Sequence, residues 1–104
     1  MLDTLTEFNF DEVLKSEIPI VIDFWAAWCK PCRLLYPVLL ELEEEYKGKL
    51  IFGKVDVDTD SIIAREYQIK SLPTLIIFKE GKPIKTLIGV LPKKRLIEEL
   101  DMII

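Results

Sequence analysis

Residues 28–32 read Trp-Cys-Lys-Pro-Cys, and they hold the only two cysteines of this 104-residue chain. An apolar run precedes them at residues 20–25, and a pattern of helical periodicity follows at residues 34–46. A strand, two cysteines separated by two residues, and a helix form the context in which such a pair indicates redox chemistry. We therefore expect the fold to be organised around this pair.

The spacing of Cys29 and Cys32 suits a disulfide that opens and closes. Side chains three residues apart on a helix lie about 5–6 Å apart, and disulfides need Cα separations of about 4.4–6.8 Å. Pro31 fits the first turn of a helix, because the N–H that it lacks would have no partner there. Cys29 then lies at the positive end of the helix dipole, which favours the nucleophilic thiolate over the thiol.

Two other interpretations of the cysteine pair are weaker. A disulfide that closes a loop of about four residues constrains the unfolded chain by only about 2 kcal/mol, so it would be a poor structural staple. A structural zinc site needs four ligands, and the chain has no second cysteine pair and no histidine. We therefore favour redox chemistry and expect no metal.

The composition indicates one globular domain over residues 1–104. Apolar residues make up 50% of the chain and charged residues 31%, which is typical of a globular protein. The net charge is −4, and the largest basic cluster is residues 93–95, which argues against nucleic acid as a main partner. No apolar run approaches the length of about 20 residues that spans a membrane, and residues 1–10 lack a secretory-signal pattern. We expect a cytoplasmic protein, since two cysteines in that compartment are more often catalytic than structural.

The rest of the chain alternates predicted strands and helices. Strands are expected at residues 2–5, 20–25, 50–57, 74–78 and 83–88, and helices at residues 9–16, 34–46, 58–67 and 92–104. Helices between strands predict parallel pairing, whereas the turn at residues 79–82 predicts an antiparallel hairpin. The pattern as a whole predicts an α/β fold.

Finer patterns predict how three of the helices are held. Asn9 and Glu12 have the spacing of a capping box, with Phe8 and Val13 as the hydrophobic staple around it. The last helix carries residues 93–95, all basic, at the positive end of its dipole, which opposes the usual preference. The central helix has a proline that should kink it and an apolar stripe that should face the core: Pro37, with Leu34, Leu35, Val38, Leu39 and Leu42.

Asp23 is the one charged residue in the apolar run 20–25. An unpaired buried carboxylate would cost several kcal/mol, or it would stay protonated well above its usual pKa. Lys54, in the middle of the strand at residues 50–57, is the one cation placed to reach it, although a lysine there is usually a snorkelling surface residue. The alternative is that Asp23 faces water or caps a turn.

Several separated features of the chain resemble the thioredoxin family along its whole length. They are residues 22–26, the stretch at 28–32, Pro37, Lys54, residues 56–58, residues 72–74, Phe78, Gly81 and Gly89. The resemblance implies the thioredoxin fold, a mixed five-stranded sheet flanked by four helices. It also implies a monomeric protein-disulfide reductase whose substrates are disulfide-containing proteins. The family's electrons come from a thioredoxin reductase that uses NADPH through flavin. The chain has no fingerprint for either cofactor, so we expect none to be bound.

The resemblance also implies residue roles. Cys29 attacks the substrate disulfide, Cys32 resolves the mixed disulfide, and the pair is recovered as the Cys29–Cys32 disulfide. Asp23 exchanges protons with Cys32, and Lys54 is its candidate partner. Pro73 is expected to follow a cis bond, which the residue pattern alone does not predict, and its loop accepts the substrate backbone. The other expected substrate contacts are Trp28, Lys30, Pro31, Leu72, Gly89 and Val90.

Lys30 is a departure from the family, whose commonest site has glycine at this position. An exposed cation beside Cys29 favours the thiolate by well under 1 kcal/mol, roughly the range of exposed ion pairs, which predicts a slightly more oxidising potential. Two other functions remain open. The apolar rim that Trp28, Leu72, Gly89 and Val90 would form could be a subunit interface without thiol chemistry. Alternatively, the protein could oxidise or isomerise disulfides. Pro31 directly before Cys32 resembles the reducing subclass more closely.

Overall fold

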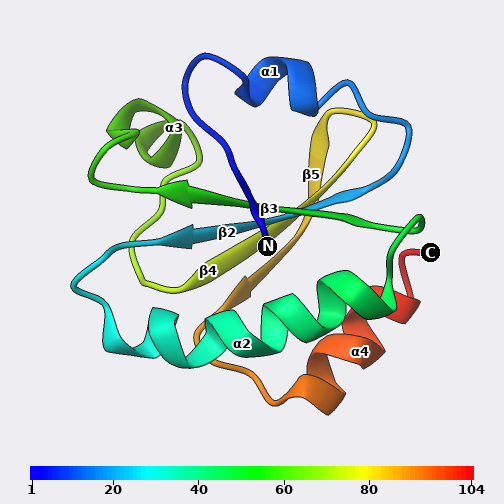
Figure 1. The fold of residues 1–104 in the computed structure, drawn as a ribbon. Helices are drawn as coiled ribbons and strands as arrows, with labels where there is room; N and C mark the ends of the chain where they lie inside the picture. Colours follow the sequence, from blue (N-terminus) through cyan, green and yellow to red (C-terminus); the bar gives the residue numbers. More distant parts are fainter.

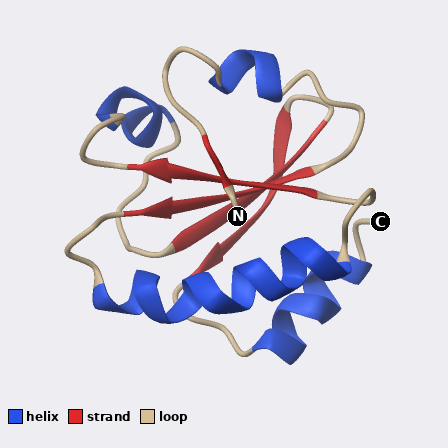
Figure 2. Ribbon diagram, in the orientation of Figure 1, coloured by secondary structure: helices blue, strands red, loops and turns tan.

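A mixed five-stranded sheet forms the middle layer of the protein, and helices cover both of its faces (Figures 1 and 2). The computed structural model describes all 104 residues. Along the chain the elements are β1 (Asp3–Thr4), α1 (Phe10–Val13), β2 (Ile20–Trp25), α2 (Lys30–Glu45), β3 (Ile51–Asp56), α3 (Ser61–Glu66), β4 (Thr74–Lys79), β5 (Lys82–Ile88) and α4 (Lys93–Asp101). None of the helices combines the length and the apolar character that crossing a membrane requires.

The strands lie in the order β1-β3-β2-β4-β5, so β2 is central and the site follows its carboxyl end. Strands β1 and β2 run parallel to β3, whereas β4 is antiparallel to both β2 and β5. The turn between β4 and β5 contains Glu80 and Gly81, both with positive φ, as a tight hairpin requires. The predicted thioredoxin fold, with parallel crossovers and one hairpin, is confirmed.

Two apolar layers hold the helices on the sheet, with α2 and α4 on one face and α1 and α3 on the other (Figure 1). The layer under α2 and α4 contains Val21, Leu35, Leu39, Leu42, Phe52, Ile77, Leu96 and Leu100. The layer under α1 and α3 contains Phe10, Ile20, Ile22, Phe24, Val55, Ile63, Ile76 and Phe78. Alternation along β2 therefore places Asp23, like Val21, on the face that α2 covers.

The predicted capping box and staple at α1 are wrong. Asn9 is the N-cap residue, but its side chain makes no capping hydrogen bond. Its Oδ1 instead accepts from the Thr6 N–H at 2.7 Å, and its Nδ2 donates to the Thr4 carbonyl at 3.2 Å. Glu12 pairs with a lysine one turn later, and Phe8 is 98% exposed, so no staple forms with Val13. The local turn competes successfully for the asparagine side chain, as short polar side chains allow.

Leu34 does not belong to the core stripe of α2, because its side chain is 60% exposed. Leu35, Leu39 and Leu42 are fully buried and follow the helical period, so the stripe is narrower than predicted. Pro37 lies inside the helix, as expected.

The basic start of α4 has a partner on the neighbouring helix. The Lys93 ammonium lies 2.9 Å from a carboxylate oxygen of Glu41 and 2.6 Å from one of Glu45. Hydrogen bonds to Glu45 and Glu41 raise the pKa of Lys93. Two carboxylates of α2 thus offset the unfavourable position of this cation at the positive end of the dipole.

Candidate active site

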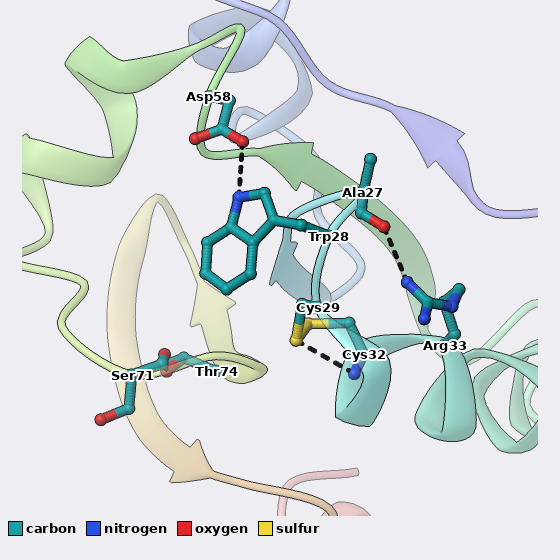
Figure 3. Close-up of a disulfide and its surroundings, with 8 residues drawn as sticks. All are labelled: Ala27, Trp28, Cys29, Cys32, Arg33, Asp58, Ser71 and Thr74. Carbon is teal, nitrogen blue, oxygen red and sulfur yellow. Dashed lines mark hydrogen bonds between the residues drawn. A yellow bond between two sulfur atoms is a disulfide. The ribbon is translucent and has the colours of Figure 1, made fainter.

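The two cysteines lie where the loop after β2 enters α2 (Figure 3). Cys29 is the N-cap residue of α2, Cys32 lies in the first turn, and their sulfur atoms form a disulfide with a Cα–Cα distance of 5.3 Å. The Cys32 N–H donates to the sulfur of Cys29 at 3.2 Å. The structure therefore places Cys29 at the positive helix end, as its position before Pro31 predicts.

The disulfide is accessible at only a small part of its surface. Cys29 is 4% exposed and Cys32 is 3% exposed, whereas Lys30 and Pro31 between them are exposed. Around the sulfurs pack apolar groups from three separate parts of the chain: Trp25, Ala26, Val57 and Leu72. Apolar packing therefore covers most of the surface of the two cysteines.

The indole of Trp28 is held beside the disulfide by a hydrogen bond that the sequence did not predict. Its Nε1 donates to Oδ2 of Asp58 at 2.9 Å, although the side chain is 69% exposed (Figure 3). Asp58 follows β3 and lies 30 positions from Trp28 in the sequence. The sequence feature that could have predicted this hydrogen bond is a carboxylate just after the end of a strand that lies beside β2 and runs parallel to it.

The loop before β4 approaches the cysteines from the other side. The bond between Leu72 and Pro73 is cis, as the family resemblance implies. The Thr74 hydroxyl donates to the Ser71 carbonyl at 2.6 Å, which closes the loop (Figure 3). Leu72 packs against the cysteines, while Pro73 itself is buried.

Gly89 joins the end of β5 to this loop, because its N–H donates to the Pro73 carbonyl at 2.9 Å. Its φ of 90° lies in the region that favours glycine. Val90 follows with 46% of its side chain exposed. The structure therefore places Gly89 and Val90 next to the Pro73 loop.

Asp23 is buried, with 2% of its surface exposed, and its Oδ1 has no hydrogen-bond partner in the protein. Burial raises the pKa of Asp23 to about 7, and the charge of Lys54 partly opposes this rise. The alternative of a water-facing or turn-capping carboxylate is wrong. A carboxyl group with a pKa near neutrality can both take up and release a proton under physiological conditions.

Lys54 is the register partner of Asp23 on β3, but its ammonium group forms no ion pair. It lies 5.3 Å from the ring centroid of Trp25 and 5.1 Å from that of Tyr36. Both distances are within the range of cation–π contacts. Tyr36 was not among the predicted site residues, although it lies one helical turn after Cys32.

A cavity of about 220 Å³ lies between these groups and Cys32. Its lining is Asp23, Trp25, Cys32, Arg33, Tyr36, Pro37 and Lys54. Three buried polar atoms in this lining lack a protein partner: Oδ1 of Asp23, Nε1 of Trp25 and Oη of Tyr36. Arg33 forms part of the cavity wall, and its Nη1 donates a hydrogen bond to the Ala27 carbonyl at 2.8 Å. Asp23 and Cys32 therefore line one partly open cavity.

Comparisons with known proteins agree with this geometry. Residues 1–102 match the family model described as Thioredoxin. A thioredoxin of Alicyclobacillus acidocaldarius subsp. acidocaldarius is 44% identical over 97 residues, and one of Staphylococcus haemolyticus (strain JCSC1435) is 45% identical over 97 residues. Each alignment covers 93% of this chain and 92% of the relative.

A relative of different size is the bifunctional thioredoxin reductase/thioredoxin of Mycobacterium leprae (strain TN). It is 42% identical over 95 residues, which cover 91% of this chain and 21% of that protein. The family match, the relatives and the Cys29–Cys32 disulfide lead to one conclusion. This chain belongs to the thioredoxin family and is a thiol–disulfide oxidoreductase.

Proposed function

We propose that the protein is a monomeric, single-domain reductant of protein disulfides, formed by residues 1–104, that cycles between the Cys29–Cys32 dithiol and disulfide. The observation that carries the proposal is a disulfide at the start of α2 that is almost buried and packed among apolar groups. Because so little of either cysteine is exposed, we expect a substrate disulfide to reach the pair when its protein docks over the site.

The reaction proceeds in two exchanges. The Cys29 thiolate attacks one sulfur of the substrate disulfide, which forms a mixed disulfide and releases the first substrate thiolate. The Cys32 thiolate then attacks the Cys29 sulfur, which forms the Cys29–Cys32 disulfide and releases the second thiolate. The two substrate sulfurs gain two electrons, the two cysteines lose two, and each substrate thiolate takes up a proton.

Asp23 serves the second exchange as the proton acceptor for Cys32. Its burial and its place in the cavity shared with Cys32 support this role. Lys54 acts by its positive charge near Asp23 and by no direct ion pair. The raised pKa of Asp23 keeps proton transfer reversible near neutral pH.

The substrate chain docks on the rim around the disulfide. In this proposal Pro73 and its loop receive the extended substrate backbone, since that loop packs beside the cysteines through Leu72. The remaining contacts are Trp28, Lys30, Pro31, Gly89 and Val90, of which Trp28, Lys30, Pro31 and Val90 are exposed.

A thioredoxin reductase supplies the electrons in this proposal. Support comes from the relative in Mycobacterium leprae, whose name joins both activities in one chain. We place the protein in the cytoplasm, where such a reductant and its reductase are kept reduced.

Trapping tests the proposal. A Cys32→Ser variant should accumulate a mixed disulfide between Cys29 and a substrate such as insulin, whereas Cys29→Ser should accumulate none.

The unsubstituted protein should reduce insulin with dithiothreitol faster than it refolds scrambled ribonuclease; the reverse order would indicate an isomerase. A variant with both Cys29→Ser and Cys32→Ser tests whether the thiols are needed in cells. If this variant still replaces the unsubstituted protein there, the protein acts as a binding module and the proposal is wrong.

A further inference from the structure

Tyr36 lies one helical turn after Cys32 on α2, and side chains on a helix lean towards the preceding turn. Its ring lines the cavity that also holds Asp23 and Lys54. Its hydroxyl group is buried without a protein partner, so no hydrogen bond within the protein accounts for the position of the ring. The ring packs against the core layer under α2 on one side and lies 5.1 Å from the Lys54 ammonium.

The Lys54 ammonium lies between two aromatic rings from different elements, Trp25 at the end of β2 and Tyr36 on α2. Without a carboxylate in ion-pairing range, these two rings are what the structure provides to hold it. A lysine on a half-exposed strand position would otherwise extend its charge into water. The rings therefore keep a positive charge at the cavity wall.

We propose that Tyr36 is a positioning residue for the reaction: with Trp25 it holds the Lys54 ammonium at the cavity, and so sets how readily Asp23 releases and takes up the proton exchanged with Cys32. The proposal rests on the proposed role of Asp23 for its catalytic meaning. Its physical content, the coupling of Tyr36 to Asp23 through Lys54, is independent of that role.

The groups around Asp23 determine in which direction its pKa changes when the Tyr36 ring is lost. They are Lys54 from β3, Cys32, Arg33 and Tyr36 from α2, and on β4 the apolar register partner Leu75. Lys54 is the charged group that lowers the pKa of Asp23 against the effect of burial. If the Tyr36 ring is lost and the ammonium moves away, the Asp23 carboxyl should therefore hold its proton to a higher pH.

The experiment compares Tyr36→Phe with Tyr36→Met in the oxidised 104-residue protein. Phenylalanine keeps the ring face, whereas methionine keeps apolar bulk without it. We expect Tyr36→Met to raise the midpoint of the Asp23 carboxyl titration, followed by carbon-13 NMR, by about 0.5 pH unit, or about threefold in proton affinity, for a charge displaced by a few ångströms. We expect Tyr36→Phe to leave the midpoint unchanged.

A Lys54→Met background separates this coupling from a change in water access. In this background Tyr36→Met should leave the midpoint of the Asp23 titration unchanged, because the ammonium group that the substitution would release is absent. The proposal is overturned if the shift persists in this background, if Tyr36→Met gives no shift with Lys54 present, or if Tyr36→Phe shifts the midpoint as much as Tyr36→Met. These readouts need no turnover, so they stay informative if Asp23 proves to have no catalytic role.

A measurement on the unsubstituted protein covers the case in which Tyr36→Met does not fold. Two aromatic rings facing the Lys54 ammonium should move the proton resonances of its ε-methylene group to high field. Resonances at the positions of an exposed lysine would overturn the proposal. Single-turnover rates of Tyr36→Phe and Tyr36→Met between pH 6 and 9 then test whether the coupling affects release of the mixed disulfide.

Discussion

Asp23 and Lys54 occupy matching register positions on the parallel strands β2 and β3, yet they form no ion pair. The ammonium group lies between two aromatic rings, and the carboxyl group is left with burial as the dominant influence on its pKa. A direct pair would have kept Asp23 ionised. The separation instead leaves an acid that is part-protonated at neutral pH, in the cavity that Cys32 also lines.

Asp23→Asn should stabilise the protein, and the gain should depend on pH. The pKa of Asp23 is about 7 in the folded protein and 3.8 ordinarily. Between these values the folded state holds a proton that the unfolded state has lost, so the free energy of unfolding falls as pH rises and stays low above pH 7. Three pH units correspond to at most about 4 kcal/mol, so we expect a gain of roughly 2–4 kcal/mol at pH 8. At pH 4 we expect little difference.

Urea unfolding of the oxidised protein at both pH values measures this gain. Asp3→Asn on β1 is a matched control, because Asp3 is exposed. It should change stability little and equally at the two pH values. A gain for Asp23→Asn that is as large at pH 4 as at pH 8 would contradict the assignment of a raised pKa.

The same substitution should slow the release of the mixed disulfide. Asparagine cannot take up the Cys32 proton, so we expect a single-turnover rate about 10- to 100-fold lower at pH 7, at or below the low end of general-base effects. The unsubstituted protein should show an inflection near pH 7 in the plot of single-turnover rate against pH, and Asp23→Asn should remove it. Rapid-mixing measurements from pH 6 to 9 report both changes, and unchanged rates across that range would remove Asp23 from the mechanism.

The features that could be predicted from sequence depend on short-range patterns. The strand at residues 20–25, the cysteine spacing and the helix that follows are each specified by neighbouring residues. The strand lies where it was predicted, whereas the helix begins at Lys30, before the predicted range 34–46. Burial of Asp23 followed from its apolar neighbours. These patterns predicted the α/β class and the position of the cysteine pair, whereas the thioredoxin fold itself was implied by the family resemblance.

The features that could not be predicted depend on residues distant in sequence. The Trp28–Asp58 hydrogen bond joins the loop after β2 to the loop after β3. The contact of Lys54 with Tyr36 requires α2 to lie across β3 at a particular rotation. The failed capping box at Asn9 has a different cause, because two local turns compete for one side chain and the pattern does not decide between them.

Lys93→Met should lower the melting temperature, because Lys93 joins α4 to Glu41 and Glu45 of α2. Its raised pKa makes this contribution fully present below pH 10.5 and lost as pH rises above that value. Lys94→Met is the matched control, since Lys94 is exposed and forms no ion pair. Thermal unfolding at low and high salt should show a larger loss for Lys93→Met that shrinks with salt. Equal losses of melting temperature for Lys93→Met and Lys94→Met would contradict a role of Lys93 in joining α4 to α2.

Tyr46→Phe should cost about 1 kcal/mol of stability at pH 7, the usual contribution of one hydrogen bond. The Tyr46 hydroxyl donates to Oδ1 of Asp101 at 2.6 Å and so joins the ends of α2 and α4. Burial and this hydrogen bond raise the pKa of Tyr46 to about 12, so its contribution is present below pH 10 and lost as pH rises towards 12. Urea unfolding in an Asp101→Ala background is the control; a loss that persists there would show that the hydrogen bond is not its cause.

Lys30→Gly should make the protein slightly more reducing. Lys30 is the first residue of α2, directly after Cys29, and its exposed charge favours the Cys29 thiolate and so the reduced form. Screening limits the effect to well under 1 kcal/mol, less than about 20 mV for two electrons. Equilibration with glutathione measures it, and Lys30→Gln separates the charge from the flexibility of glycine. Both variants should approach the parent at high salt; a parent more reducing than Lys30→Gln at low salt would refute this.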